Sequence, residues 1–399
     1  MISPFFNGTL TATLTARATR AERTTLPPRG GSITDIAIAE ETSMQMRAAR
    51  MHGYNQPLQI DEVPVPDVGP NQVLIKVAAT GMCRSDFQLV DGYFRQGLPV
   101  ELPFIPGHEV AGTIAAVGAE VSTSSGISEG DQIVVDPNWG DGTCRQCHEG
   151  NEQLCSGGQL VGFGPNGGFA EYMLAPHNHV ISVADQPNQR PEYLAPLTDA
   201  GITPYRGMKK LRDAGKLGAG RTVVINGIGG LGSYAVQYAR LLGAGATVVG
   251  FARSDAKLAM ARENGAHHTV NVHSKTVEDV QNELEELTGR RTVDAVLDCA
   301  GSAESLGLAA SILATEGALS QVGLMGQRVE LPVFPFVSGE KSYFGSFWGN
   351  YNDLKEVLTL ASQGLIRHHV VPVQLDNINE TLEALGRGDI VGRAVVVFD

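Results

Sequence analysis

The sequence lacks three features that would each point to a different class of protein. It has no excess of basic residues, since 30 Lys and Arg stand against 43 Asp and Glu and leave a formal net charge of −13, whereas a general nucleic-acid binder needs a basic face. No run of 18 apolar residues occurs, so no membrane-spanning helix is expected. Five cysteines in 399 residues are too few for a disulfide framework. We therefore expect no nucleic-acid or membrane partner, and a cytoplasmic protein with reduced thiols.

The chain does contain enough apolar material for large cores, at 42% hydrophobic residues. At about 150 residues per domain, its length predicts two or three domains. Glycine makes up 48 of the 399 residues, which indicates many tight turns or close backbone approaches.

Residues 1–45 differ in composition from the rest. The first 31 residues contain seven Thr and four Arg, with Glu22 as their one acidic residue. No apolar stretch is long enough for a secretory signal. We interpret residues 1–45 as a disordered N-terminal extension, and an organellar transit peptide is the alternative, because such peptides are basic, hydroxylated and poor in acids.

Two kinds of secondary-structure pattern follow one another along the chain. From about Met46 to Tyr193 short strands and turns predominate, including 72–77 and 132–135, which predicts an antiparallel, partly barrel-like domain. From 222–226 onward strands and helices alternate, and such βα units form a parallel, doubly wound sheet. The fold class is therefore α/β with an additional β-rich domain.

A glycine-rich loop follows the strand at 222–226 directly. Gly227, Gly229 and Gly232 form GxGxxG, with Gly230 and Leu231 between them, and a helical pattern follows. In this context the first glycine permits the tight turn, the second lets the backbone approach a pyrophosphate, and the third allows close helix–strand packing. The free N–H groups of the helix N-terminus then face the anion. The loop predicts a dinucleotide site.

The end of the next strand bears on the choice of cofactor. NAD sites usually have Asp or Glu about 20 residues beyond the loop, where it binds the ribose 2′-OH. Here Ala252 stands at that place, followed by Arg253 and Ser254, which could bind a 2′-phosphate. We therefore favour NADP(H), with NAD(H) as the alternative if Asp255 contacts the ribose.

Three of the five cysteines, Cys144, Cys147 and Cys155, fall within 12 residues. Thiolates at this spacing can bind one ion, and tetrahedral zinc needs a fourth ligand. Asp141 precedes Cys144 by three residues and is our preferred fourth ligand, with His148 as the competing candidate. This cluster predicts a structural zinc site.

A second cluster is discontinuous. Cys83 lies in Gly81-Met-Cys-Arg-Ser-Asp86, and His108 lies in Gly107-His-Glu-Val-Ala-Gly112. With the Cys-rich segment and GxGxxG following in that order, the chain from residue 46 to 399 resembles the zinc-dependent alcohol dehydrogenases of the medium-chain dehydrogenase/reductase superfamily. The resemblance implies a GroES-like catalytic domain formed by 46–200 and 345–399, a Rossmann domain at 201–344, and a homodimer or homotetramer.

The same resemblance implies a set of site residues. The catalytic zinc would be held by Cys83, His108 and Asp199, where many family members have a third ligand of Cys in place of Asp. Three protein ligands leave a fourth position open for substrate. Asp86 would fix the tautomer of His108, and Glu109 would lie behind the metal.

Further roles concern proton transfer and the cofactor. Ser85 resembles the family's proton-relay hydroxyl, whereas Gln88 stands where several members have a titratable His. The resemblance also implies that Arg84 and Arg393 contact the pyrophosphate, Thr203 lies near the nicotinamide, and Trp139 lies in the substrate pocket.

The predicted function is interconversion of alcohols with aldehydes or ketones by hydride transfer to or from NAD(P), with two zinc ions per chain. The intact cysteine cluster and Trp139 favour simple apolar substrates. A polyol or sugar dehydrogenase of the same superfamily is the alternative. A non-catalytic NADPH-binding relative is less favoured, because the metal ligands are retained.

Overall fold

The computed structural model of the chain describes residues 44–184, 186 and 190–398. Residues 1–43, which make up nearly all of the predicted N-terminal extension, lie outside the described residues. The first described elements are β1 (Gln45–Arg50) and β2 (Gln59–Pro64), which pair antiparallel.

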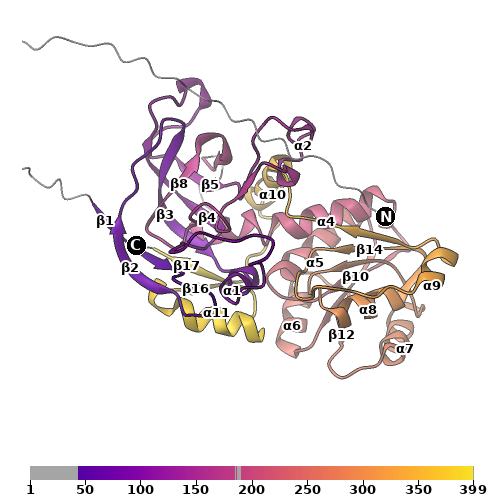
Figure 1. Cartoon of the computed structure of the whole chain (residues 1–399). Helices are drawn as coiled ribbons and strands as arrows, with labels where there is room; N and C mark the ends of the chain where they lie inside the picture. The colour runs from indigo at the N-terminus through magenta and orange to yellow at the C-terminus, as the bar shows by residue number, and fades with distance from the viewer. Residues whose placement is uncertain (1–43, 185, 187–189, 399) are drawn as a thin grey trace, which may run out of the picture. The chain divides into compact units, whose positions relative to one another are not determined.

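The β-rich part contains a seven-stranded sheet (Figure 1). Its order is β16-β17-β3-β4-β5-β9, and β8 pairs with β3 as well. Only the pair β16–β17 is parallel among these. The strands are β3 (Gln72–Gly81), β4 (Glu109–Val117), β5 (Gln132–Val135), β8 (Tyr172–Pro176), β9 (Val180–Ser182), β16 (Val370–Val373) and β17 (Arg393–Val397).

Strand β3 illustrates why this sequence forms a sheet. Val73, Ile75 and Val77 are buried on one face and join one core cluster, because successive side chains of a strand point to opposite faces. The predicted strands at 72–77 and 132–135 are both present, and β3 continues to Gly81. The predicted antiparallel β-rich domain is thus confirmed.

The second part is a six-stranded parallel sheet in the order β12-β11-β10-β13-β14-β15. This is the order of a doubly wound dinucleotide-binding sheet, as expected. The strands are β10 (Thr222–Asn226), β11 (Thr247–Ala252), β12 (His268–Asn271), β13 (Val293–Asp298), β14 (Leu313–Gln321) and β15 (Ser342–Gly345). Four helices alternate with these strands: α5 (Gly230–Leu242), α6 (Asp255–Glu263), α7 (Val277–Thr288) and α8 (Ala303–Ile312).

Both faces of the parallel sheet are buried, as its uninterrupted apolar strands predict. On β10, Val223 and Ile225 belong to the largest core cluster, whereas Val224 between them belongs to a second cluster on the opposite face. The strand ends therefore meet at one edge of a rigid sheet, and the glycine-rich loop leaves from that edge.

Two longer helices connect the parts. Helix α4 (Ile202–Asp213) packs against α5 and β14, and α10 (Tyr351–Ser362) packs against α4. The remaining elements are α1 (Arg84–Val90), η1 (Thr123–Ser125), β6 (Asn138–Trp139), α2 (Arg145–His148), η2 (Glu152–Leu154), β7 (Gln159–Leu160), η3 (His177–His179), α3 (Pro191–Leu194), η4 (Ala195–Thr198), α9 (Val333–Ser338), η5 (Leu375–Asn377) and α11 (Ile378–Arg387). Within the described residues, no helix combines the length and apolar character needed to cross a membrane.

Candidate active site

A cavity of about 1040 Å³ is lined by residues of both parts. The parallel sheet contributes the glycine-rich loop and the ends of its strands. The β-rich part contributes Cys83, Ser85, Phe163 and Arg393, and the segment before α4 contributes Asp199. Residues more than 300 positions apart thus face one space.

The glycine-rich loop is shaped for a ligand that needs close backbone approach. Gly227 has φ +97°, a left-handed conformation that other residues rarely adopt. A Cβ atom on Gly232 would lie 2.1 Å from the carbonyl oxygen of Gly227, so this position must be glycine for helix α5 to pack on β10. A Cβ atom on Gly229 would meet nothing within 4 Å. No neighbouring atom of the protein therefore requires glycine at position 229, and the open space beside it would suit a bound pyrophosphate, with the loop as its cradle.

Basic residues gather in the cavity wall beyond β11. Arg253, Ser254, Lys257 and Lys275 line the cavity. Burial and then the charge of Arg253 lower the pKa of Lys257, which shows that the cations lie close together. Asp255 accepts a hydrogen bond from the amide of Asn271 at 3.0 Å and is not among the lining residues.

Arg84 reaches the same region from α1. Its guanidinium donates to the carbonyl oxygen of Leu385 at 3.0 Å, and its Nε has no hydrogen-bond partner in the part of the chain that the structure describes. Burial and then the charge of Arg253 lower the pKa of Arg84. The two arginines therefore belong to one positively charged wall, which suits an anionic ligand.

The three predicted catalytic-metal ligands come together. Potential donor atoms of Cys83, His108 and Asp199 all lie within 4.8 Å of one another. They come from the N-terminus of α1, the residue before β4, and the turn before α4. A thiol, an imidazole and a carboxylate form a donor set that zinc accepts.

The surroundings of His108 show that a cation fits there. Its Nδ1 lies 3.1 Å from Asp86 Oδ1, and Asp86 Oδ2 accepts the backbone N–H of Cys83 at 2.7 Å. Its Nε2 is buried and lies 3.4 Å from a carboxylate oxygen of Asp199, a contact outside ideal hydrogen-bond geometry, and has no better partner among the described residues. Burial lowers the pKa of His108, but the charge of Asp86 and the hydrogen bond of Asp199 outweigh it and hold the pKa well above its usual value. Positive charge is therefore favoured at this point.

Glu109 and Arg393 are buried next to the ligands, and Arg393 reaches the cavity wall. Arg393 Nε donates to Glu109 at 2.9 Å, and its Nη2 bonds both Glu109 and, at 2.9 Å, Asp199. Glu109 also accepts the backbone N–H of Ala200 at 2.9 Å. Burial raises the pKa of Glu109 to about 7 against the opposing charge of Arg393. Gly81 leaves room for this carboxylate, since a Cβ atom there would lie 1.6 Å from Glu109 Oε2.

Electrostatic interactions also hold Asp199. Burial alone would raise its pKa, but the hydrogen bond and charge of His108 and the charge of Arg393 keep the pKa well below its usual value. Thr203 Oγ1 donates to Asp199 Oδ1 at 3.0 Å. Ser85 lines the cavity two residues after Cys83, and the Gln88 amide donates to the carbonyl oxygen of Leu324 at 2.8 Å.

Trp139 does not take its predicted place. It is buried in a core cluster of the β-rich part, where its Nε1 donates to the carbonyl oxygen of Asp136 at 2.9 Å. It is not among the residues that line the cavity, whereas Trp348 is. The reason is the pairing of β6 with β7, which directs Trp139 into the sheet core.

The cysteine-rich segment forms the second cluster. We call residues 140–158 the cysteine lobe. Cys144 Sγ lies 3.6 Å from Cys147 Sγ and 3.7 Å from Cys155 Sγ, and Cys147 Sγ lies 3.8 Å from Asp141 Oδ1. Two sulfurs bound at about 2.3 Å to one tetrahedral ion are about 3.8 Å apart, so these distances fit a metal. Hydrogen bonds from Thr143 lower the pKa of Asp141 to about 2. His148 is not in this group.

Sequence reasoning did not find most of the apolar wall. Phe94, Leu160, Phe163 and Trp348 line the cavity near the ligands. Nothing in their local pattern distinguishes them from ordinary core residues. Lys257 was detectable, since it follows Ser254 by three residues on a helix and so lies on the same face.

Comparisons with known proteins agree with this geometry. Residues 69–185 match the family described as "Alcohol dehydrogenase GroES-like domain", and residues 230–363 match "Zinc-binding dehydrogenase". Over 354 residues the chain is 34% identical to the D-arabinose 1-dehydrogenase (NADP(+)) of Saccharolobus solfataricus, covering 88% of this chain and 98% of that protein. The chain belongs to the zinc-type medium-chain alcohol dehydrogenase family.

Two further relatives are similar over the same extent. The chain is 34% identical to an NAD-dependent alcohol dehydrogenase of Sulfurisphaera tokodaii, covering 88% of this chain and all of that protein. The crystal structure of the alcohol dehydrogenase from Aeropyrum pernix superposes with a TM-score of 0.81 at 37% identity, covering 88% of this chain and 100% of that one. This family member is therefore an NAD(P)-dependent oxidoreductase, with the GroES-like and Rossmann-type parts that we predicted.

Two glycine substitutions in this alcohol dehydrogenase should separate folding from cofactor binding. Gly232→Ala should lower Tm, because overpacking against Gly227 costs about 1–3 kcal/mol. Gly229→Ala should leave Tm unchanged and raise the Kd for the dinucleotide at least about tenfold, since lost hydrogen bonds to a charged group cost about 1.5–3 kcal/mol. Thermal unfolding and fluorescence titration with NADPH measure both effects.

Gly164→Ala is the matched control, because Gly164 is exposed, faces open space and lies outside the cavity wall. It should change neither quantity. A Gly229→Ala protein that binds the dinucleotide as the wild type does would contradict the assignment of the cradle.

Proposed function

We propose that this protein interconverts alcohols with aldehydes or ketones by hydride transfer to or from NADP(H), using a zinc ion held by Cys83, His108 and Asp199. The observation that carries the proposal is that two members of this ligand cluster, Cys83 and Asp199, line the same cavity as the glycine-rich loop. A hydride can pass only between groups in contact, and a shared cavity lets nicotinamide and substrate meet beside the ligands.

A bound zinc would polarise the substrate oxygen, and the nicotinamide would exchange the hydride. The residues of the chain would orient the ligands and carry the proton. Asp86 orients His108 so that Nε2 faces the ligand cluster. Ser85 would accept the alcohol proton and pass it toward the nicotinamide ribose. Gln88 cannot titrate, so the proton would reach solvent through ribose and water.

Three other residues would position the cofactor. Arg84 and Arg393 would contact the pyrophosphate, and Thr203 would lie beside the nicotinamide ring. Arg393 supports this role because a Cβ atom on Gly230, in the cradle, would lie 2.6 Å from its Nη1. Its other nitrogens are occupied by Glu109 and Asp199.

The preference for NADP(H) rests on the wall beyond β11. Arg253 and Lys257 line the cavity where a 2′-phosphate would lie, and Lys275, which pairs with Glu283, lines it as well. Asp255, the residue that could bind an unphosphorylated ribose, is bonded to Asn271 instead.

A sugar or polyol substrate is the second candidate, favoured by the similarity to D-arabinose 1-dehydrogenase. The wall near the ligands argues for an apolar substrate, because Phe94, Leu98, Phe163 and Trp348 give it few groups that could bond several hydroxyls. A non-catalytic role is disfavoured by the complete ligand set.

The proposed function is tested by initial rates at 340 nm with NADPH and NADH, across ketones, aldehydes and sugars. We expect turnover with ketones and aldehydes, faster with NADPH. Arg253→Asp should lower kcat/KM for NADPH at least about tenfold, since a charge-assisted hydrogen bond is worth about 1.5–3 kcal/mol, and leave that for NADH nearly unchanged.

Arg262→Asp provides the matched control, because Arg262 is exposed on α6, the helix that follows Arg253, and lies outside the cavity wall. Faster turnover with NADH in the wild type would contradict the NADP preference but not the dehydrogenase function. Turnover with sugars alone would favour the second candidate.

We further propose two zinc ions per chain, the second held by Asp141, Cys144, Cys147 and Cys155. Elemental analysis after dialysis should give two equivalents for the wild type and one for Cys83→Ala, which should also lose turnover and still bind NADPH. Cys147→Ser should lose the other equivalent.

The fifth cysteine supplies the control for metal content. Cys299 lies outside both clusters, so Cys299→Ser should retain two equivalents. One equivalent in the wild-type protein, retained in Cys147→Ser, would contradict the second site.

We propose that the protein is a homo-oligomer that uses α9 and the neighbouring edge of the parallel sheet. Val333, Phe334 and Val337 on α9 are 78%, 78% and 71% exposed. Strand β15 ends the sheet order, so among the described residues its outer side has no partner strand. An exposed apolar patch beside an open edge is typical of a protein interface.

Light scattering coupled to size exclusion should give a dimer or tetramer for the wild type and a smaller species for Phe334→Glu. Leu241→Glu, on the exposed end of α5, is the control and should not change the mass. A monomeric wild type would refute this interface.

A further inference from the structure

Trp348 lies in the wall of the active-site cavity, beside a candidate metal ligand. Its ring centroid lies 5.6 Å from that of His108 and 6.2 Å from that of Phe163, both in edge contacts. It is 7% exposed and lines the cavity. A bulky, rigid indole at this place would limit the size of the group that a substrate carries beside its reacting carbon.

Neither the backbone conformation of Trp348 nor a hydrogen bond of its indole explains why the ring lies here. Its backbone φ is +41°, a conformation that is rare for a bulky residue and persists only when the surroundings impose it. Its Nε1 is buried without a hydrogen-bond partner among the described residues. Besides its edge contacts with His108 and Phe163, the position of the ring therefore depends on what holds the chain on either side.

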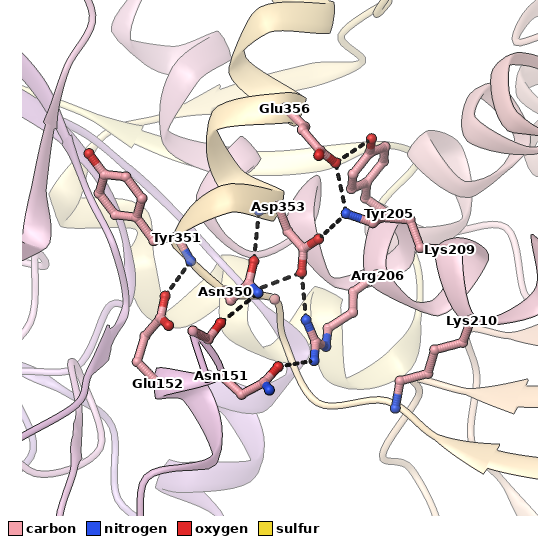
Figure 2. A network of polar contacts seen from close by, with 12 residues as sticks. Asn151, Glu152, Tyr205, Arg206, Lys209, Lys210, Asn350, Tyr351, Asp353 and Glu356 are labelled. Carbon is pink, nitrogen blue, oxygen red and sulfur yellow. Dashed lines mark hydrogen bonds and ion pairs between the residues drawn. The ribbon is translucent and has the colours of Figure 1, made fainter. Parts of the chain in front are cut away.

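Helix α4 holds both ends of the segment that carries Trp348. Before it, Lys210 donates to the carbonyl oxygen of Gly345 at 2.6 Å. After it, Arg206 and Lys209 donate to the two carboxylate oxygens of Asp353 at 2.8 and 2.7 Å (Figure 2). Asp353 is almost fully buried, so these ion pairs lie away from solvent.

The cysteine lobe holds the same segment from the other side. The amide of Asn350 donates to the carbonyl oxygen of Gly150 at 2.7 Å, and the backbone N–H of Tyr351 donates to Glu152 (Figure 2). The same Arg206 that binds Asp353 donates to the side-chain oxygen of Asn151 at 2.9 Å. The lobe, α4 and the start of α10 thus meet at one guanidinium.

The other end of α4 leads to the candidate metal site. Thr203, in its first turn, bonds Asp199 through both its backbone N–H and its hydroxyl, each at 3.0 Å. Gly349 packs on the first residue of the helix, since a Cβ atom there would lie 2.3 Å from Ile202. One rigid helix therefore relates the position of Asp199 to that of Trp348.

We propose that Trp348 determines which substrates the cavity accepts, and that Arg206 and Asp353 are positioning residues that hold it there by joining α4, α10 and the cysteine lobe. The proposal rests on the proposed function, because it assumes a substrate beside Cys83, His108 and Asp199. It extends that function by naming a size-selecting residue and the contacts that fix it.

The selecting role is tested with ketones graded in size. Trp348→Ala should shift the ratio of kcat/KM for bulky over small ketones upward by about tenfold or more, as expected for filling or emptying an apolar pocket. Trp348→Phe should lie between the two. The Kd for NADPH, measured separately, should stay within about twofold of the wild type, because the change affects the substrate region.

The positioning role has a spectroscopic readout, because the chain has only two tryptophans, Trp139 and Trp348. Fluorine NMR of protein labelled with 5-fluorotryptophan should show two resonances, assigned with Trp139→Phe. Asp353→Asn should shift or broaden the Trp348 resonance, leave that of Trp139 nearly unchanged, and move the substrate ratio in the same direction as Trp348→Ala, by less.

Glu356→Gln is the matched control. Glu356 lies on the same helix and bonds Lys209 and Tyr205, both at 2.8 Å, but none of its hydrogen bonds reaches the segment that carries Trp348. This variant should alter neither the Trp348 resonance nor the substrate ratio. Arg206→Lys should behave as Asp353→Asn does, since an ammonium cannot bridge Asn151 and Asp353 with a planar fork.

Three outcomes would overturn parts of the proposal. An unchanged substrate ratio in an active Trp348→Ala enzyme refutes the selecting role. An unchanged Trp348 resonance in folded Asp353→Asn and Arg206→Lys proteins refutes the positioning role. A wild type without turnover on any carbonyl compound refutes the proposed function and the selecting role together, while the resonances still decide the positioning role.

Discussion

The active site depends on one buried ion-pair cluster, in which Arg393 bonds both Glu109 and Asp199. These residues belong to three chain segments: the last strand, the start of β4 and the turn before α4. Removing one member of such a cluster leaves an uncompensated buried charge, which costs about 3–5 kcal/mol. The cluster therefore fixes how the C-terminal strand, the β-rich sheet and the helix leading into the parallel sheet meet. It also places a candidate metal ligand, Asp199, and the glycine-rich loop beside one guanidinium.

The cluster also explains why a cation belongs in front of it. The carboxyl groups of Asp86 and Asp199 lie beside His108, and Glu109 lies next to Asp199 through the guanidinium of Arg393, which bonds both. The imidazole of His108, with Asp86 on one side and Asp199 on the other, has its pKa raised well above the usual value because the site favours positive charge. A divalent ion held by Cys83, His108 and Asp199 would supply that positive charge, with the imidazole as a neutral ligand. The electrostatics thus agree with the family to which the chain belongs.

Sequence reasoning predicted features that depend on local chemistry and missed those that depend on distant packing. The alternation of apolar strands with helices predicted the parallel sheet, and GxGxxG predicted its loop, because turn and helix chemistry are local. The cysteine spacing likewise predicted the cluster with Asp141, which now lies beside the three sulfurs. The place of Trp139 was predicted wrongly: whether a tryptophan faces a core or a cavity depends on which strand pairs with its own, here β7. The ion pairs of Arg393 with residues 194 and 284 positions away had no local signal either.

The cysteine lobe likewise combines local chemistry, in its cysteine cluster, with contacts to distant parts of the chain. A loop that served only to hold its own metal would need contacts only within 140–158. Yet Gly150 and Glu152 accept hydrogen bonds from Asn350 and Tyr351 at the start of α10, 199 to 200 positions later. Asn151 accepts one from Arg206 on α4. Those contacts converge on the segment whose backbone carries the positive φ of Trp348. A strained backbone persists only where several elements impose it together. The lobe, with α4 and α10, therefore helps to hold the segment of the cavity wall that carries Trp348. A metal held by Cys144, Cys147 and Cys155 would then act at a distance, by fixing Gly150 and Glu152 where they contact the start of α10.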